Sequence, residues 1–147
     1  MTVRTPPSNP APWHIYIVAF VALIINGFGA VDYVGAQLFP DAYFFQADPD
    51  VREFFMRTVW YEQFVWAVGV WFAVAAPVAL AWRSRWTIPL TWIALAGIVL
   101  TVVDEYFSDW PDAIDQPSKH LYNAMIIAVQ IGLLIYARAM RRKGLLT

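Results

Sequence analysis

The sequence contains no cysteine, so disulfide bonds, thiol redox chemistry and thiolate metal ligands are all excluded. The same absence excludes the four-helix membrane oxidases that couple reactive thiols to a quinone. Charged residues are also missing from four long stretches, residues 5–31, 63–82, 86–103 and 120–137. Each stretch is about as long as a helix that crosses a bilayer, because roughly 20 residues at 1.5 Å of rise match about 30 Å of hydrocarbon.

The residues that are present agree with a membrane environment, since 60% are hydrophobic, 17% aromatic and only 14% charged. A helix satisfies its own backbone hydrogen bonds in lipid. We therefore predict an all-α fold, an integral membrane bundle of four transmembrane helices in one domain at 13–143. The predicted spans are about 13–33, 58–82, 88–107 and 119–138. Residues 1–12, which include four prolines, form a flexible cytoplasmic tether, and residues 144–147 form a cytoplasmic tail. An amphipathic helix that begins near residue 48 is expected to run straight into the second span.

Charged residues divide between the two sides that a four-span chain visits in turn. One side carries seven basic residues and no acid: Arg4, Arg83, Arg85, Arg138, Arg141, Arg142 and Lys143. The other side carries all eleven acids against three basic residues. Short loops rich in Lys and Arg stay in the cytoplasm. We therefore predict a multi-pass protein of the bacterial inner membrane, with N-in/C-in topology and the lipid bilayer as its partner. With a net charge of −1, nucleic-acid binding has no support.

Polar side chains at membrane depth indicate the candidate site, because such groups are costly in lipid and usually face the bundle interior. The candidates are Asn26, Asp32, Glu62, Asp104, Glu105, His120, Asn123 and Gln130. The topology places the four carboxylates and His120 at the same outer membrane face. We expect an outer-facing polar vestibule, with Asn26, Asn123 and Gln130 as its floor, that binds a cation, a proton or a small polar solute. The alternative is that these residues are ordinary solvated helix ends.

No arrangement of residues identifies a catalytic or metal site. The serines lie outside the spans, and none belongs to a recognisable nucleophile motif. His14 and His120 lie near opposite membrane faces, so they cannot both ligate one haem. A zinc site at His120 with carboxylate partners is chemically reasonable, but the spacing gives it no specificity. Catalytic residues are therefore not assigned, and metal and cofactor stay open.

Four segments carry a resemblance to a known group of proteins: residues 25–33 (INGFGAVDY), 66–71 (WAVGVW), 82–86 (WRSRW) and 136–142 (YARAMRR). In these segments the chain resembles uncharacterised proteobacterial four-helix inner-membrane proteins, which automatic labels describe as sugar transporters or DoxX-like proteins. Glu62 and Gln63 depart from the resemblance, because apolar residues are expected there. The resemblance implies the topology more than an activity.

Two classes of function remain open from the sequence. In the first, the protein is not an enzyme but a small-solute or cation carrier working as a homo-oligomer, or an accessory subunit packed against a larger membrane complex. Four helices alone enclose little volume, so a carrier would need a symmetric partner. In the second, which the resemblance implies, the chain is a DoxX-like quinone-linked membrane enzyme or enzyme subunit.

Overall fold

The computed structural model describes residues 12–43, 47, 49–57, 59–108 and 117–147. Most of the predicted tether and four acidic residues, Asp48, Asp109, Asp112 and Asp115, lie outside these ranges. Within them the chain forms helices and no strand. The helices are α1 (Trp13–Leu38), α2 (Pro40–Tyr43), α3 (Pro49–Arg57), α4 (Trp60–Ala81), α5 (Thr87–Phe107) and α6 (Pro117–Arg142).

Four of these helices, α1, α4, α5 and α6, are long and apolar enough to cross a membrane. The predictions of an all-α fold and of four long apolar helices are therefore confirmed. The boundaries differ in two places. Helix α1 continues to Leu38, beyond the predicted end at residue 33. Helix α3 does not run straight into α4, so that expectation was wrong. Val59 between them is extended, and its N–H donates to the Glu62 carboxylate at 3.2 Å, which starts a new helix.

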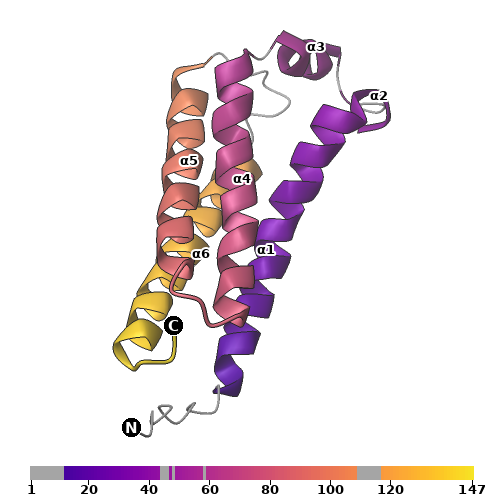
Figure 1. Cartoon of the computed structure of the whole chain (residues 1–147). Coiled ribbons are helices and arrows are strands. Elements are labelled where there is room, and N and C mark those ends of the chain that lie inside the picture. The colour runs from indigo at the N-terminus through magenta and orange to yellow at the C-terminus, as the bar shows by residue number, and fades with distance from the viewer. Residues whose placement is uncertain (1–11, 44–46, 48, 58, 109–116) are drawn as a thin grey trace, which may run out of the picture.

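The long helices run between two ends of the molecule (Figure 1), and these ends differ in the charged residues that they carry. We call the end with the start of α1, the α4–α5 turn and the C-terminus the terminal end. The opposite end, where α2 and α3 lie across the long helices, is the acidic end. The acidic residues within the described ranges lie there: Asp32, Asp41, Asp50, Glu53, Glu62, Asp104 and Glu105. The charge separation seen along the sequence is thus a separation in space.

Helices α4 and α5 form the closest pair in the bundle because two glycines face each other between them. A Cβ atom placed on Gly97 would lie 2.6 Å from the Gly69 nitrogen and 2.7 Å from its Cα. A Cβ on Gly69 would lie 3.1 Å from the backbone nitrogen of Ile98. Small residues let helix backbones approach in this way, and the gain is van der Waals contact along both helices. Helices α4 and α5 therefore form one closely packed unit against which the other helices lie.

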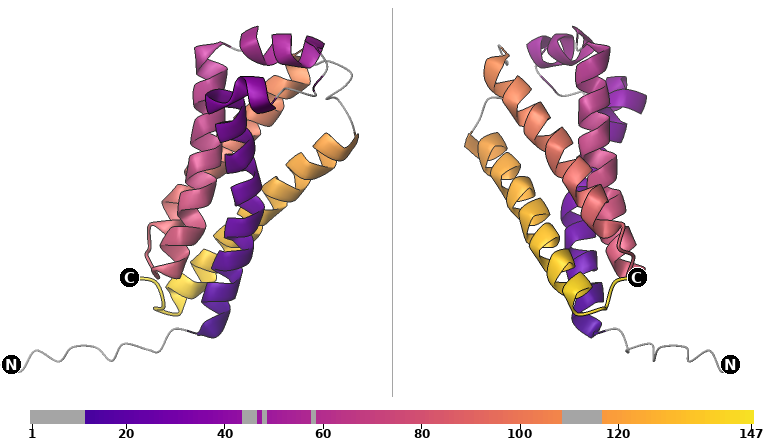
Figure 2. Two further views of the ribbon diagram at one scale, coloured as in Figure 1. Left: turned by 90° about the vertical axis from the view of Figure 1, so that its right-hand side faces the viewer. Right: turned by 60° about the vertical axis from the view of Figure 1, so that its left-hand side comes forward.

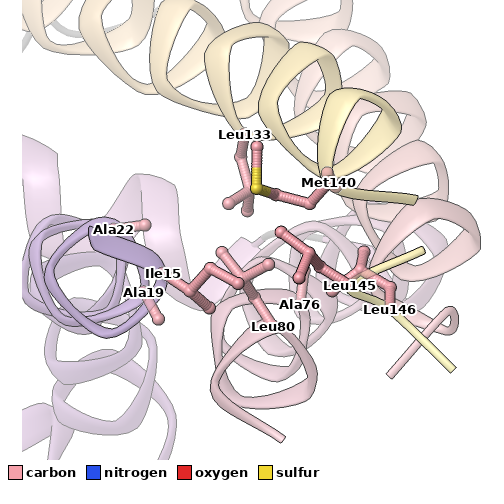
Figure 3. Close-up of a cluster of buried hydrophobic side chains, with 10 residues drawn as sticks. Ile15, Ala19, Ala22, Ala76, Leu80, Leu133, Met140, Leu145 and Leu146 are labelled. Atoms are coloured by element: carbon pink, nitrogen blue, oxygen red, sulfur yellow. The ribbon is translucent and has the colours of Figure 1, made fainter. Parts of the chain in front are cut away.

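Buried apolar side chains fill the bundle at the terminal end (Figure 3). Ile15 from α1 and Leu80 from α4 are fully buried there, and Leu133 and Met140 from α6 pack against the same cluster. Helix α5 adds the partly buried Ile88 and Leu90. The terminal end is consequently closed by close packing.

The C-terminal segment belongs to this core. Residues 144–147 are predicted from the sequence to form a cytoplasmic tail, yet Leu145 and Leu146 are buried in the terminal cluster. Thr147 pairs with the α4–α5 turn through two backbone hydrogen bonds, one to the Arg83 carbonyl at 2.8 Å and one from the Arg85 N–H at 2.9 Å. Arg83 adopts a positive φ of 58° at this turn, and its Nε donates to the Leu145 carbonyl at 3.0 Å. The segment thus ties α6 to the basic turn.

Large apolar side chains cover the outside of the long helices. Those more than half exposed include Phe20, Phe28, Phe64, Leu100 and Ile135. Exposed aromatic residues lie near both ends, among them Trp13, Trp82 and Trp86 at the terminal end and Trp60 and Tyr106 at the acidic end. Soluble monomers rarely expose apolar faces of this extent, whereas aromatic belts around an apolar band are typical of lipid-facing surfaces.

Candidate functional site

The long helices separate toward the acidic end. Figure 2 shows α6 near α1 at the terminal end and slanting away from α4 toward the acidic end. A cleft of about 1120 Å³ lies between the helices, and residues of α1, α3, α4, α5 and α6 line it. The cleft occupies the region where the sequence places a polar vestibule.

The structure brings five of the eight predicted site residues together in this cleft. They are Asp32 of α1, Glu62 of α4, Asp104 and Glu105 of α5 and Asn123 of α6. The other three, Asn26, His120 and Gln130, are not among the lining residues. The carboxylates come together because each lies near the end of an apolar helix, and these ends of α1, α4 and α5 converge.

Glu105 links α5 to α6 at one wall of the cleft. Its carboxylate accepts a hydrogen bond from the Asn123 amide at 2.8 Å and lies 3.5 Å from the Lys119 ammonium. The side chains of Lys119 and Glu105 are only 14% and 15% exposed, so solvent screens this pair less than a surface pair. Glu105 therefore has its own counter-charge within the protein.

Asp32 is bound by a tyrosine that folds back over the end of α1. The Tyr43 hydroxyl donates to the Asp32 carboxylate at 2.9 Å. The ring reaches this position because it lies against Gly35, where a Cβ atom would come within 2.4 Å of the ring. Partial burial, then the hydrogen bond and the negative charge of Asp32, raise the pKa of Tyr43 from 10.0 to about 12. Tyr43 therefore orients the Asp32 carboxylate through a neutral hydrogen-bond donor and adds no positive charge beside it.

Asn26 and Gln130 pair with each other below the cleft. The Gln130 Nε2 donates to the Asn26 Oδ1 at 2.7 Å, and the Asn26 Nδ2 donates to the Ala22 carbonyl at 2.7 Å. The Ala22 carbonyl fixes the orientation of both side-chain amides. Turning the Asn26 amide over would place its oxygen against the Ala22 oxygen, and turning the Gln130 amide over would place its oxygen against Asn26 Oδ1. Gln130 is fully buried, and its Oε1 has no hydrogen-bond partner among the described residues. Ile126, one helical turn from Gln130, lines the cleft instead. The pair joins α1 to α6 beneath the cleft.

Several lining residues were not identified by the sequence analysis. Trp66 lies in the cleft wall with the Phe55 ring 6.3 Å away and the Tyr33 ring 4.9 Å away. Tyr122 also lines the cleft; its buried hydroxyl has no hydrogen-bond partner and lies 3.8 Å from the Cβ position of Gly29. Helical spacing gives a partial signal, because Tyr122 and Ile126 are four residues apart on the face that carries Asn123.

The two histidines lie at opposite ends of the bundle, as the sequence predicted. His14 Nδ1 is hydrogen-bonded to the Tyr136 hydroxyl near the terminal end, whereas His120 begins α6 near the acidic end. In the part of the chain that the structure describes, no group of three or more His, Asp or Glu side chains is placed to hold a metal ion.

The resemblance to four-helix inner-membrane proteins stays a prediction. Comparisons with models of protein families, with curated proteins and with solved structures find no match to this chain.

Proposed function

We propose that this chain is a non-enzymatic, multi-pass protein of the bacterial inner membrane, with both termini in the cytoplasm and the acidic end in the periplasm. Support comes from the four long apolar helices and from the separation of charge between their ends. Arg83, Arg85, Arg141 and Arg142 lie at the terminal end, which the positive-inside tendency places in the cytoplasm. Anionic lipid headgroups are the natural partners of these side chains.

Within that orientation, the protein is a carrier for a small solute, which enters the cleft from the periplasmic side. The observation that carries this proposal is the depth of the acid-lined cleft. Its lining extends along α4 from Tyr61 to Val70, a distance of about 14 Å at 1.5 Å per residue. A cleft of this depth reaches nearly halfway across a hydrocarbon core of about 30 Å.

Because the terminal end is closed, a carrier of this kind must open it to release its solute there. The packed cluster around Ile15 and Leu80 blocks the path from the floor of the cleft to the cytoplasm. Transport therefore requires a second arrangement in which α6 or α1 moves away from α4 at that end. The α4–α5 pair, joined at Gly69 and Gly97, is the part best suited to stay fixed. A symmetric homo-oligomer would supply further walls for such a movement.

Flux measurements in proteoliposomes test the carrier proposal. Vesicles that contain the purified protein are incubated with a panel of radiolabelled sugars, amino acids and amines, and the label retained inside the vesicles is counted. We expect at least one solute class to enter faster than into protein-free vesicles, and Asp104→Asn to lower that rate. Asp41→Asn is the matched control, because Asp41 lies at the same end but does not line the cleft. If no solute enters faster than into empty vesicles, the carrier proposal fails and an accessory-subunit function is the remaining candidate.

A further inference from the structure

The cleft has a charged layer above an apolar layer. Along α4 the lining runs from Glu62 down to Val70, and along α5 from Asp104 down to Ile98. At 1.5 Å per residue, the apolar floor lies about 9 to 12 Å below the carboxylates. Gly29, Gly69 and Ile126 complete that floor, and none of them carries a charge. A ligand that matches both layers has a polar or charged group joined to an apolar body.

Among the residues that the structure describes, the charge of the upper layer is negative. Six acidic residues of this set line the cleft against two basic ones: Asp32, Asp50, Glu53, Glu62, Asp104 and Glu105 against Arg57 and Lys119. Both basic residues are already engaged, since Arg57 forms an ion pair with Glu53 and Lys119 lies 3.5 Å from Glu105. A cleft lined by one sign of charge concentrates ions of the opposite sign.

Three carboxylates, each from a different helix, remain without a basic partner. Within the described ranges, no Lys, Arg or His side chain lies within ion-pair distance of Asp32, Glu62 or Asp104. Asp32 accepts a hydrogen bond from the Tyr43 hydroxyl, and Glu62 accepts one from the Val59 N–H, so neither carboxylate is neutralised by these partners. All three carboxylates line the same cleft, so a cation that enters it is attracted by each of them.

The form of the site favours a large cation over a small metal ion. The described residues offer no group of three ligating side chains close enough to coordinate a metal. A cleft of about 1120 Å³ also far exceeds the space that one ion fills. Aromatic rings stand in the wall between the charged and apolar layers, among them Trp66, Phe55 and Tyr122. Aromatic faces attract organic cations, by about 0.5 to 2 kcal/mol per contact.

We infer that the cleft binds an organic cation with an apolar body, such as a quaternary ammonium or phosphonium compound that carries aromatic or alkyl groups. Its positive centre lies among Asp32, Glu62 and Asp104, and its apolar part extends toward Gly69 and Ile98. This inference rests on the proposed function, because it names the class of solute that the same cleft takes up.

Two ions of equal shape and opposite charge test the inference. Tetraphenylphosphonium and tetraphenylborate are titrated against the protein in lipid nanodiscs by equilibrium dialysis, with empty nanodiscs as the baseline for partition into lipid. We expect saturable binding of the phosphonium and at least tenfold weaker binding of the borate. Removal of one nearby charge at an effective dielectric constant of about 40 corresponds to about a tenfold loss of affinity. Asp104→Asn therefore weakens phosphonium binding about tenfold, whereas Asp41→Asn leaves it unchanged.

A third variant separates failure of this inference from failure of the proposed function. Val102→Trp places a large side chain in the lining of the cleft, and we expect it to abolish phosphonium binding. If both ions bind equally and Val102→Trp removes both, the cleft takes solutes but not cations in particular, so the inference is overturned and the function stands. If neither ion binds above the empty-nanodisc baseline, or Val102→Trp changes neither, the inference is overturned and solute entry into the cleft loses its support. A circular dichroism spectrum and a gel-filtration profile matching wild type verify that each variant is folded.

Discussion

Asp32 and Tyr43 form the contact that connects α2 to the cleft. The tyrosine hydroxyl donates a hydrogen bond to a carboxylate that lines the cleft, and Gly35, which has no Cβ atom, leaves space for the ring. A phenol keeps the carboxylate oriented without neutralising it, whereas an arginine at the same position would remove the charge. The contact therefore holds Asp32 in place and preserves the electrostatic character of the cleft.

The raised pKa of Tyr43, about 12 against an ordinary value of 10.0, predicts a pH dependence of stability. Between these values the folded protein keeps a proton that the unfolded chain releases. The stability that Tyr43 contributes is therefore complete below about pH 10 and is lost as the pH rises through about 12. The phenolate absorbance is titrated in detergent micelles for wild type and for Tyr43→Phe. The variant curve subtracted from the wild-type curve should show one group that titrates near pH 12. Asp32→Asn should move that titration toward 10. A subtracted curve centred near 10 in wild type would contradict the prediction.

Asn26 and Gln130 show the limit of reasoning from single residues. Their depth in apolar helices identifies both as interior polar groups, and the structure places both in the interior. The sequence does not reveal that they bond to each other, because that depends on how far α1 and α6 are rotated and shifted. Their direct hydrogen bond and the bond from Asn26 to the Ala22 carbonyl pair three of their four side-chain polar atoms, and neither residue lines the cleft. In membrane bundles such a bond stabilises the folded state by about 0.6 to 2 kcal/mol.

The four long helices were predictable because hydropathy and charge act over whole segments, and twenty apolar residues leave few other structures. The gathering of the carboxylates at one end could also be predicted from the sequence, because successive long helices run in opposite directions and every second connection lies on the same side. The contact of Gly69 with Gly97 did not follow, because lone glycines are common in spans and their register depends on two helices at once. Burial of Leu145 and Leu146 was missed for the same reason, since a short segment beyond a helix shows no periodic pattern. The acidic layer of the cleft was thus predictable, and its aromatic wall was not.

Helices α4 and α5 give a prediction at the scale of elements. Gly97→Ala brings a Cβ atom within 2.7 Å of two Gly69 backbone atoms, which cannot move as a side chain can. The helices must separate, and we expect the free energy of unfolding to fall by about 1 to 3 kcal/mol. Gly69→Ala, whose closest contact is 3.1 Å, should cost less.

The control for this pair is Gly132→Ala on α6, where a Cβ atom meets nothing within 4 Å. Alanine favours a helix over glycine by about 0.5 to 1 kcal/mol, so this variant should equal or exceed wild type in stability. Denaturant unfolding in mixed micelles ranks the three variants against wild type. A Gly97→Ala protein as stable as Gly132→Ala would show that the close approach of α4 and α5 does not stabilise the fold.

At the scale of the whole molecule, closure at one end and opening at the other follow from one feature, the slant of α6. Near Leu133 and Met140 this helix packs into the terminal core, and the segment after it is tied to the α4–α5 turn. Toward Lys119 it moves away from α4, and the space becomes the cleft. A solute that draws Asp32 of α1 toward Asp104 of α5 would tilt α1 about the Asn26–Gln130 bond. Binding at the acidic end would therefore loosen the packing at the terminal end, which is the coupling a carrier needs.

The orientation of the molecule decides whether that coupling moves solute inward, and the absence of cysteine makes it measurable. Ser118→Cys and Thr147→Cys each introduce one exposed thiol, at the acidic and the terminal end respectively. With the terminal end in the cytoplasm, a membrane-impermeant maleimide should label Ser118→Cys in intact spheroplasts and Thr147→Cys only after the membrane is opened. The reason is that the basic residues of the α4–α5 turn and the end of α6 resist transfer across the bilayer. The reverse labelling would place the acidic cleft in the cytoplasm, and the cleft would then be an exit for solutes leaving the cell.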